Sequence, residues 1–137
     1  YGADGTVNVS KTKLSDYTAS VTGGGFDVCI EACGSSRTFL DAIDSSAFAG
    51  RIILIGNGKT DTTFLHSIIL KKELNIFGSR NSYRKDFEEA IDFVGRGEID
   101  VMKMVSNIYP LSEADKAFRA LADNDGSLAK VLIEITK

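Results

Sequence analysis

Two short apolar runs that stop at glycine organise this chain: Gly25-Phe26-Asp27-Val28-Cys29-Ile30-Glu31-Ala32-Cys33-Gly34 and Arg51-Ile52-Ile53-Leu54-Ile55-Gly56-Asn57-Gly58. Both are rich in β-branched residues and apolar on both faces, which is typical of parallel strands covered by helices. Between them, residues 35–47 carry apolar side chains at helical spacing and begin with Ser35-Ser36. A strand, a helix and a strand in this order predict a parallel pair with a right-handed crossover.

A third apolar run, Leu74-Asn75-Ile76-Phe77-Gly78, follows a second helical pattern and extends the predicted sheet. All three runs end in small or polar residues, namely Cys33-Gly34, Gly56-Asn57-Gly58 and Ser79-Arg80-Asn81. In open α/β sheets the ligand binds at the carboxyl ends of the strands. The sequence therefore predicts an α/β fold with a binding site at these three loops.

The composition narrows the class of protein. The chain has 137 residues, of which 43% are hydrophobic and 26% charged, as in ordinary globular domains. The net charge of −3 argues against nucleic acid or an anionic membrane as a partner. On a strand, Cys29 and Cys33 would be separated by about 13 Å, which is too far for a disulfide. We therefore expect reduced thiols and a cytoplasmic location.

The remaining segments carry weaker patterns. Residues 2–9 are expected to form a short strand, and Thr62 or Thr63 to begin the second helix. Ser82 is expected to cap a longer helix that ends at Gly95. Residues 105–111 are expected to be extended, and residues 130–135 to form a closing strand. A further helix is expected between these two segments.

No catalytic motif can be assigned from the residues alone. Gly56-Asn57-Gly58 lacks the third glycine of a dinucleotide-binding turn, and Gly58-Lys59-Thr60 lacks the upstream glycine of a Walker loop. His66 is the only histidine, and Cys29 with Cys33 lacks two partners for a structural zinc site. These patterns indicate neither a catalytic group nor a metal ligand in this chain.

Several segments follow one another in a characteristic order: Gly2-Ala3-Asp4 with Val7-Asn8, then Gly25 to Gly34, then Gly50 to Gly56, then Lys72 to Ser79, and finally Ile108-Tyr109-Pro110-Leu111 with Lys130-Val131-Leu132. In this order and spacing they resemble the medium-chain dehydrogenase/reductase family over nearly the whole chain. Ser79-Arg80-Asn81-Ser82 is most similar to the zinc-dependent polyol and sugar-acid branch, such as sorbitol and galactonate dehydrogenases. This stretch disfavours the zinc-free quinone reductase branch.

The resemblance implies an incomplete doubly wound (Rossmann-like) parallel sheet that lacks its first two strands. Residues 1–81 would be the C-terminal half of an NAD(P)-binding domain, and residues 82–137 a segment that returns to the catalytic domain. The catalytic zinc ligands, the glycine-rich turn and the acidic residue that holds the ribose would precede Tyr1. The chain opens without a methionine, and we expect a fragment that is inactive by itself.

The family's activity implies a parent enzyme that oxidises a secondary alcohol of a polyol or sugar acid by hydride transfer to NAD or NADP, with zinc as a second cofactor. No catalytic residue and no zinc ligand of the family falls in this chain. Glycine lets a cofactor approach the backbone, and arginine can pair with a phosphate, which agrees with cofactor contact at the strand ends. The positions that match the family's cofactor-binding segments are Cys33, Gly34, Ile55, Gly56, Asn57, Ser79, Arg80 and Asn81.

The edges of the predicted sheet lead us to expect an oligomer, and a competing hypothesis treats the chain as a complete module. Without its first two strands, the sheet presents an open apolar edge at residues 26–32, and the resemblance implies dimerisation through residues 74–78. We therefore expect a homo-oligomer that forms through strand edges. The competing hypothesis is a complete, non-catalytic α/β module that binds a nucleotide or a protein, because fold alone does not establish function.

Overall fold

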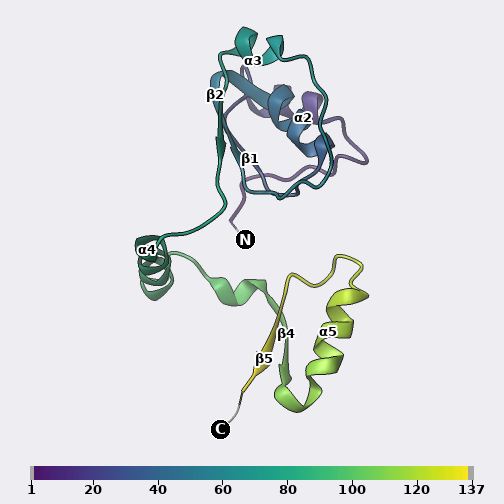
Figure 1. Cartoon of the computed structure of the whole chain (residues 1–137), viewed down its shortest axis with the longest axis vertical. Helices are drawn as coiled ribbons and strands as arrows, with labels where there is room; N and C mark the ends of the chain where they lie inside the picture. Colours follow the sequence, from purple (N-terminus) through teal and green to yellow (C-terminus); the bar gives the residue numbers. More distant parts are fainter. Residues whose placement is uncertain (1, 136–137) are drawn as a thin grey trace. The chain divides into compact units, whose positions relative to one another are not determined.

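The computed structural model describes residues 2–135 of the chain. The chain divides into two compact units. Asp4–Asn81 form one unit, and the residues from Ser82 on form the other together with the first residues of the chain. Each unit has a parallel sheet of its own, with three strands in the first and two in the second (Figure 1).

The first unit alternates helices and strands. Its elements are α1 (Leu14–Val21), β1 (Phe26–Glu31), α2 (Ser36–Ser45), β2 (Ser46–Leu54), α3 (Ser67–Lys72) and β3 (Asn75–Gly78). The strands are parallel in the order β1-β2-β3. Helix α2 begins as the sequence predicts, because the Ser35 hydroxyl accepts a hydrogen bond from the Thr38 amide at 3.1 Å. The predicted parallel α/β fold is confirmed.

A small core joins α2 and α3 to one face of this sheet. Ile43 of α2, Ile52 of β2 and Leu74 just before β3 are buried. Partly buried apolar side chains surround them, among them Phe39, Leu40, Ile68 and Ile69. Because side chains alternate along a strand, Val28 and Ile30 of β1 point away from this core, and they are 43% and 63% exposed. The strand β1 therefore lies at the edge of the sheet with an uncovered apolar face.

Two local expectations for this unit are wrong. Residues 2–9 form no strand, and none of the strand pairs among the described residues includes them. The second helix begins at Ser67 rather than at Thr62 or Thr63. The Thr62 hydroxyl donates to the Ser36 hydroxyl at 2.9 Å, which holds this segment against the start of α2 instead.

The second unit contains α4 (Arg84–Gly95), a 3₁₀ turn η1 (Val101–Met104), β4 (Val105–Pro110), a 3₁₀ turn η2 (Leu111–Glu113), α5 (Ala114–Ala122) and β5 (Lys130–Glu134). Strands β4 and β5 are parallel, with α5 as the crossover between them. The N-cap of α4 is Tyr83 rather than the expected Ser82, and the Tyr83 amide donates to the Asp86 carboxylate at 2.7 Å.

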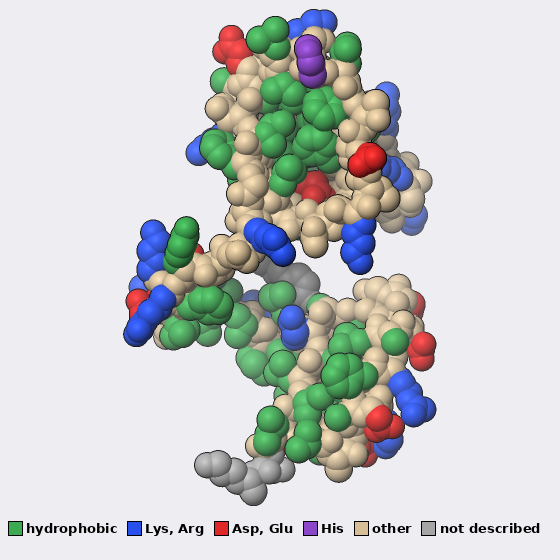
Figure 2. Space-filling model, viewed as in Figure 1, with side chains coloured by type: hydrophobic (Ala, Val, Ile, Leu, Met, Phe, Trp, Pro, Cys, Tyr) green, Lys and Arg blue, Asp and Glu red, His purple; other side chains and the backbone are tan. Residues whose placement is uncertain are grey.

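Helix α4 leaves its apolar side chains uncovered. Phe87 and Ile91 are 63% and 68% exposed, and Figure 2 shows hydrophobic side chains gathered on the surface of both units. By contrast, Ala117 of α5 is buried. None of the helices in residues 2–135 combines the length and the apolar character needed to cross a membrane.

Candidate functional site

The three strands of the first unit end side by side. Glu31 ends β1 and pairs with Leu54 at the end of β2, and Leu54 pairs with Gly78 at the end of β3. Backbone hydrogen bonds then join the loops to the strands. The Ile55 amide donates to the Glu31 carbonyl at 2.9 Å, and the Ser79 amide donates to the Leu54 carbonyl at 2.9 Å. The carboxyl edge of the sheet is therefore a continuous, ordered surface.

Two of these loops touch each other at glycines. A Cβ atom on Gly56 would lie 2.7 Å from the Cα of Gly34 and would also meet the Gly34 nitrogen. Gly34 has a φ of 71°, and a Cβ atom there would lie 2.8 Å from the carbonyl carbon of Asn57. A side chain at either position would clash with backbone, so only glycine allows the loops to approach this closely.

Glu31 holds the first of these loops in place. Its Oε1 accepts hydrogen bonds from the Thr38 hydroxyl at 2.6 Å, the Gly34 amide at 2.8 Å and the Cys33 amide at 2.9 Å. The Thr38 hydroxyl is the main reason that the pKa of Glu31 lies below its ordinary value of 4.5, and these amides act in the same direction against the effect of burial. The carboxylate therefore stays ionised and fixes the loop at neutral pH.

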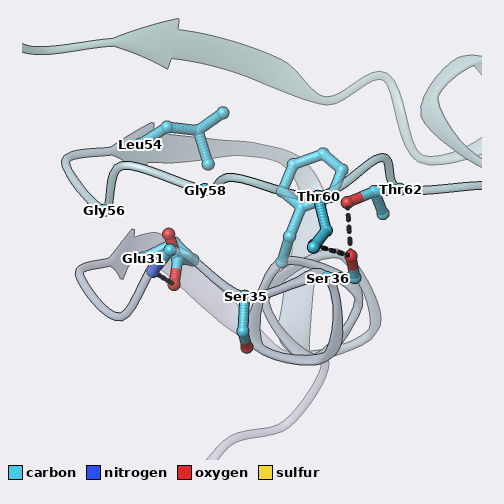
Figure 3. Close-up of a pocket in the computed structure, with 10 residues that line it drawn as sticks. Glu31, Ser35, Ser36, Leu54, Gly56, Gly58, Thr60 and Thr62 are labelled. Carbon is cyan, nitrogen blue, oxygen red and sulfur yellow. Dashed lines mark hydrogen bonds between the residues drawn. The ribbon is translucent and has the colours of Figure 1, made fainter.

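A pocket of about 200 Å³ opens between this loop, the start of α2 and the loop after β2 (Figure 3). The Ser36 hydroxyl lies at its wall, donates to the Asp61 carbonyl at 3.1 Å and accepts from the Thr62 hydroxyl. The hydroxyls and glycines at this helix N-terminus suit a polar ligand group, beside the apolar walls that Phe39 and Leu54 provide. The lining residues are Glu31, Gly34, Ser35, Ser36, Phe39, Leu54, Gly56, Gly58, Thr60 and Thr62.

The structure brings most of the predicted cofactor-binding positions together at this edge. Cys33 and Gly34 lie in the loop after β1, and Ile55, Gly56 and Asn57 in the loop after β2 that packs against it. Ser79 follows β3 and is tied to the end of β2 through its amide. Arg80 and Asn81 come next and are exposed. Cofactor contact by these eight residues stays a prediction.

Two polar groups that organise the edge, Glu31 and Thr38, are not among the site residues that the sequence predicts. The sequence pattern places Glu31 in a strand and Thr38 in a helix. A carboxylate at the end of an apolar strand, three residues before a glycine, was the available signal, because burial of a charge requires hydrogen-bond partners. Thr38 gave no such signal, since its role depends on the folded position of α2.

No metal site emerges among residues 2–135, where no group of three or more His, Cys, Asp or Glu side chains is placed to hold an ion. His66 is exposed and precedes α3. Cys29 and Cys33 are free thiols, as the sequence predicts. The Cys29 sulfur accepts a hydrogen bond from the Ser46 hydroxyl at 3.3 Å.

Comparison with known proteins gives a consistent set of similarities. A sequence profile described as zinc-binding dehydrogenase matches residues 1–96. An uncharacterized zinc-type alcohol dehydrogenase-like protein of Haemophilus influenzae is 30% identical over 131 residues, which are 95% of this chain and 38% of that protein. The sorbitol dehydrogenase of Halalkalibacterium halodurans is 26% identical over 134 residues, or 96% of this chain and 38% of that protein.

A solved dehydrogenase structure is similar to this chain as well. A short chain alcohol dehydrogenase of Escherichia coli CFT073 in complex with NADH superposes with a TM-score of 0.88 at 27% identity. The superposition covers 98% of this chain and 39% of that one. The chain thus spans somewhat more than a third of the length of the proteins it matches.

Proposed function

This chain belongs to the zinc-binding dehydrogenase family, and we propose that it is the C-terminal part of a zinc- and NAD(P)-dependent oxidoreductase. The parent enzyme would oxidise a secondary alcohol of a polyol or sugar acid by hydride transfer. The similarity to a sorbitol dehydrogenase supports this substrate class. The structural observation that carries the proposal is the contact between Gly34 and Gly56, which holds the loops after β1 and β2 together at the sheet edge where dinucleotides bind.

Within this proposal the two parts of the chain have different roles. Residues 1–81 supply the C-terminal half of the nucleotide-binding domain, and residues 82–137 return to the catalytic domain. Backbone and side chains of the three strand-end loops contact NAD or NADP. Arg80, exposed at the last of these loops, pairs with a cofactor phosphate. The proposed contacts are Cys33, Gly34, Ile55, Gly56, Asn57, Ser79, Arg80 and Asn81.

Zinc would be held by residues of the parent protein outside this chain. The chemistry that zinc would supply in the parent enzyme is polarisation of the alcohol oxygen, and the nicotinamide would be the hydride acceptor. The residues of this chain position the cofactor and keep its loops rigid, and Glu31 does so by fixing the loop that carries Gly34. We therefore expect the 137-residue chain by itself to have no dehydrogenase activity.

We further propose a cytoplasmic homo-oligomer with no nucleic-acid or membrane partner. The net charge of −3 and the two free thiols support this environment. Strands β1 and β3 are the two edges of the sheet, and both carry exposed apolar side chains, such as Ile30 at 63% and Phe77 at 51%. Such edges pair readily with a second chain.

The first test compares this chain with the protein encoded by the whole reading frame. The longer protein should contain bound zinc and reduce NAD⁺ or NADP⁺ in the presence of sorbitol or a sugar acid, read as absorbance of the reduced nicotinamide. Calorimetric titration of NADH into the 137-residue chain should show no binding. Micromolar binding to the short chain, with no activity in the longer protein, would instead establish the non-catalytic nucleotide-binding module.

A further inference from the structure

The loop after β2 contains the single Asn-Gly pair of the sequence, Asn57 and Gly58. Both residues are exposed, and Gly58 lines the pocket at the strand ends (Figure 3). The carboxamide of an asparagine can be attacked by the backbone nitrogen of the residue that follows it. Glycine obstructs this attack least because it has no Cβ atom and restricts the backbone least. The pair therefore places a reactive carboxamide at the edge of the sheet.

Both reacting groups are unrestrained by hydrogen bonds. In the described part of the chain, no protein group bonds to the Asn57 carboxamide, and the Gly58 amide donates to no carbonyl. Asn124 is different, because its Nδ2 atom donates to the Leu128 carbonyl at 2.9 Å. Its Oδ1 atom also accepts from the amides of Gly126 and Leu128, at 2.9 and 3.0 Å. The Asn57 side chain can therefore turn toward the next nitrogen without breaking such bonds, as an intramolecular attack requires.

We propose that Asn57 is a site of spontaneous covalent modification, at which its carboxamide becomes a carboxylate. The Gly58 amide gives its proton to hydroxide, and its nitrogen attacks the Cγ atom of Asn57. A bond between this nitrogen and Cγ closes a succinimide ring, the bond from Cγ to Nδ2 breaks, and ammonia leaves with a proton from water. Water then opens the ring. Opening at Cγ yields aspartate, whereas opening at the main-chain carbonyl yields isoaspartate.

The modification alters the loop where it touches Gly34. A Cβ atom on Gly34 would lie 2.8 Å from the carbonyl carbon of Asn57 and 2.9 Å from the Gly58 nitrogen, so the peptide unit that reacts packs against Gly34. Isoaspartate adds one carbon atom to this backbone, and close packing leaves no room for it. We therefore expect the loops after β1 and β2 to separate. The new negative charge would also repel the phosphates of a dinucleotide, a consequence that alone rests on the proposed function.

The test is incubation of the 137-residue chain at neutral and at alkaline pH, followed by tryptic digestion and mass spectrometry. Cleavage places three asparagines in separate peptides, residues 52–59, 81–84 and 120–130. Conversion at Asn57 should be at least about fivefold faster than at Asn81, which is exposed but precedes Ser82, and than at the hydrogen-bonded Asn124. It should also accelerate at alkaline pH, because the deprotonated nitrogen is the nucleophile.

The variant Gly58→Ala tests the role of the glycine. A Cβ atom there would lie 3.3 Å from the Gly34 carbonyl oxygen, a contact that a small shift relieves. The variant should slow conversion at Asn57 at least about fivefold and leave Asn124 unchanged. Amide hydrogen exchange at Gly34 should accelerate in the isoaspartyl form, and unchanged exchange would overturn the predicted separation of the loops.

Two results would overturn the modification site itself. One is conversion at Asn57 that is no faster than at Asn81, and the other is an equal rate at Asn57 in Gly58→Ala. These measurements involve no zinc, cofactor or alcohol. Their outcome is therefore independent of the activity assay that tests the proposed function.

Discussion

Replacement of Glu31 by glutamine tests whether its carboxylate organises the strand-end site. The Oε1 atom of Glu31 accepts three hydrogen bonds, and the residue is only 5% exposed. Glutamine keeps an acceptor at this position but removes the charge. Because a hydrogen bond to a charged group contributes about 1.5–3 kcal/mol and one between neutral groups about 1, Glu31→Gln should lower the free energy of unfolding by about 1–2 kcal/mol. Glu31→Ala removes all three bonds and should cost about 2–4 kcal/mol.

The pH dependence separates this effect from a simple loss of packing. The pKa of Glu31 lies below 4.5 in the folded chain and returns to about that value when the chain unfolds. The stabilisation by the carboxylate is thus complete well above pH 4.5, and it is lost as the pH falls through the lower, folded pKa. Glutamine does not titrate in this range. The gap between wild type and Glu31→Gln should therefore narrow as the solution is acidified.

Urea denaturation followed by circular dichroism, at pH 7 and at steps down to about pH 3, measures this gap. Amide hydrogen exchange at Cys33 and Gly34 reports on the loop directly and should accelerate in the variant. Thr38→Val, which removes one donor and keeps the side-chain shape, should show a smaller loss. A gap that is below about 0.5 kcal/mol at pH 7, or that does not change with pH, would refute the role assigned to the carboxylate.

Three further predictions concern the same unit. Gly56→Ala should destabilise it by about 1–3 kcal/mol because the new methyl group meets the backbone of Gly34, whereas Gly78→Ala enters open space and should change little; urea midpoints compare the two. Lys72→Met should cost about 2 kcal/mol in the same assay, since the Lys72 ammonium donates to three backbone carbonyls at the end of α2, at 2.8–2.9 Å. Glu73→Gly should raise the melting temperature and stabilise by about 1 kcal/mol, because this C-cap residue has a φ of 54°; an unchanged melting temperature would show that no strain is stored there.

The regular part of the fold could be predicted because its signals are local. The alternation of apolar runs with the Ser35-capped helix identified β1, α2 and β2, and the glycines at the strand ends identified the edge that carries the candidate site. The start of the second helix is predicted wrongly because a contact with a residue far away in the sequence overrides the local pattern. Thr62 is a good residue to begin a helix, but in the folded chain its hydroxyl bonds to Ser36, which is 26 residues away.

The parallel α/β class, the order of the strands along the chain and the positions of the loops that follow them can all be inferred from the residues alone. The folded structure is needed to see that Gly34 packs against Gly56 and that the Glu31 carboxylate turns back to bind its own loop. The physical reason is range: periodicity and capping act within a few residues, whereas the contact between Gly34 and Gly56 joins two loops that only the pairing of β1 with β2 brings together.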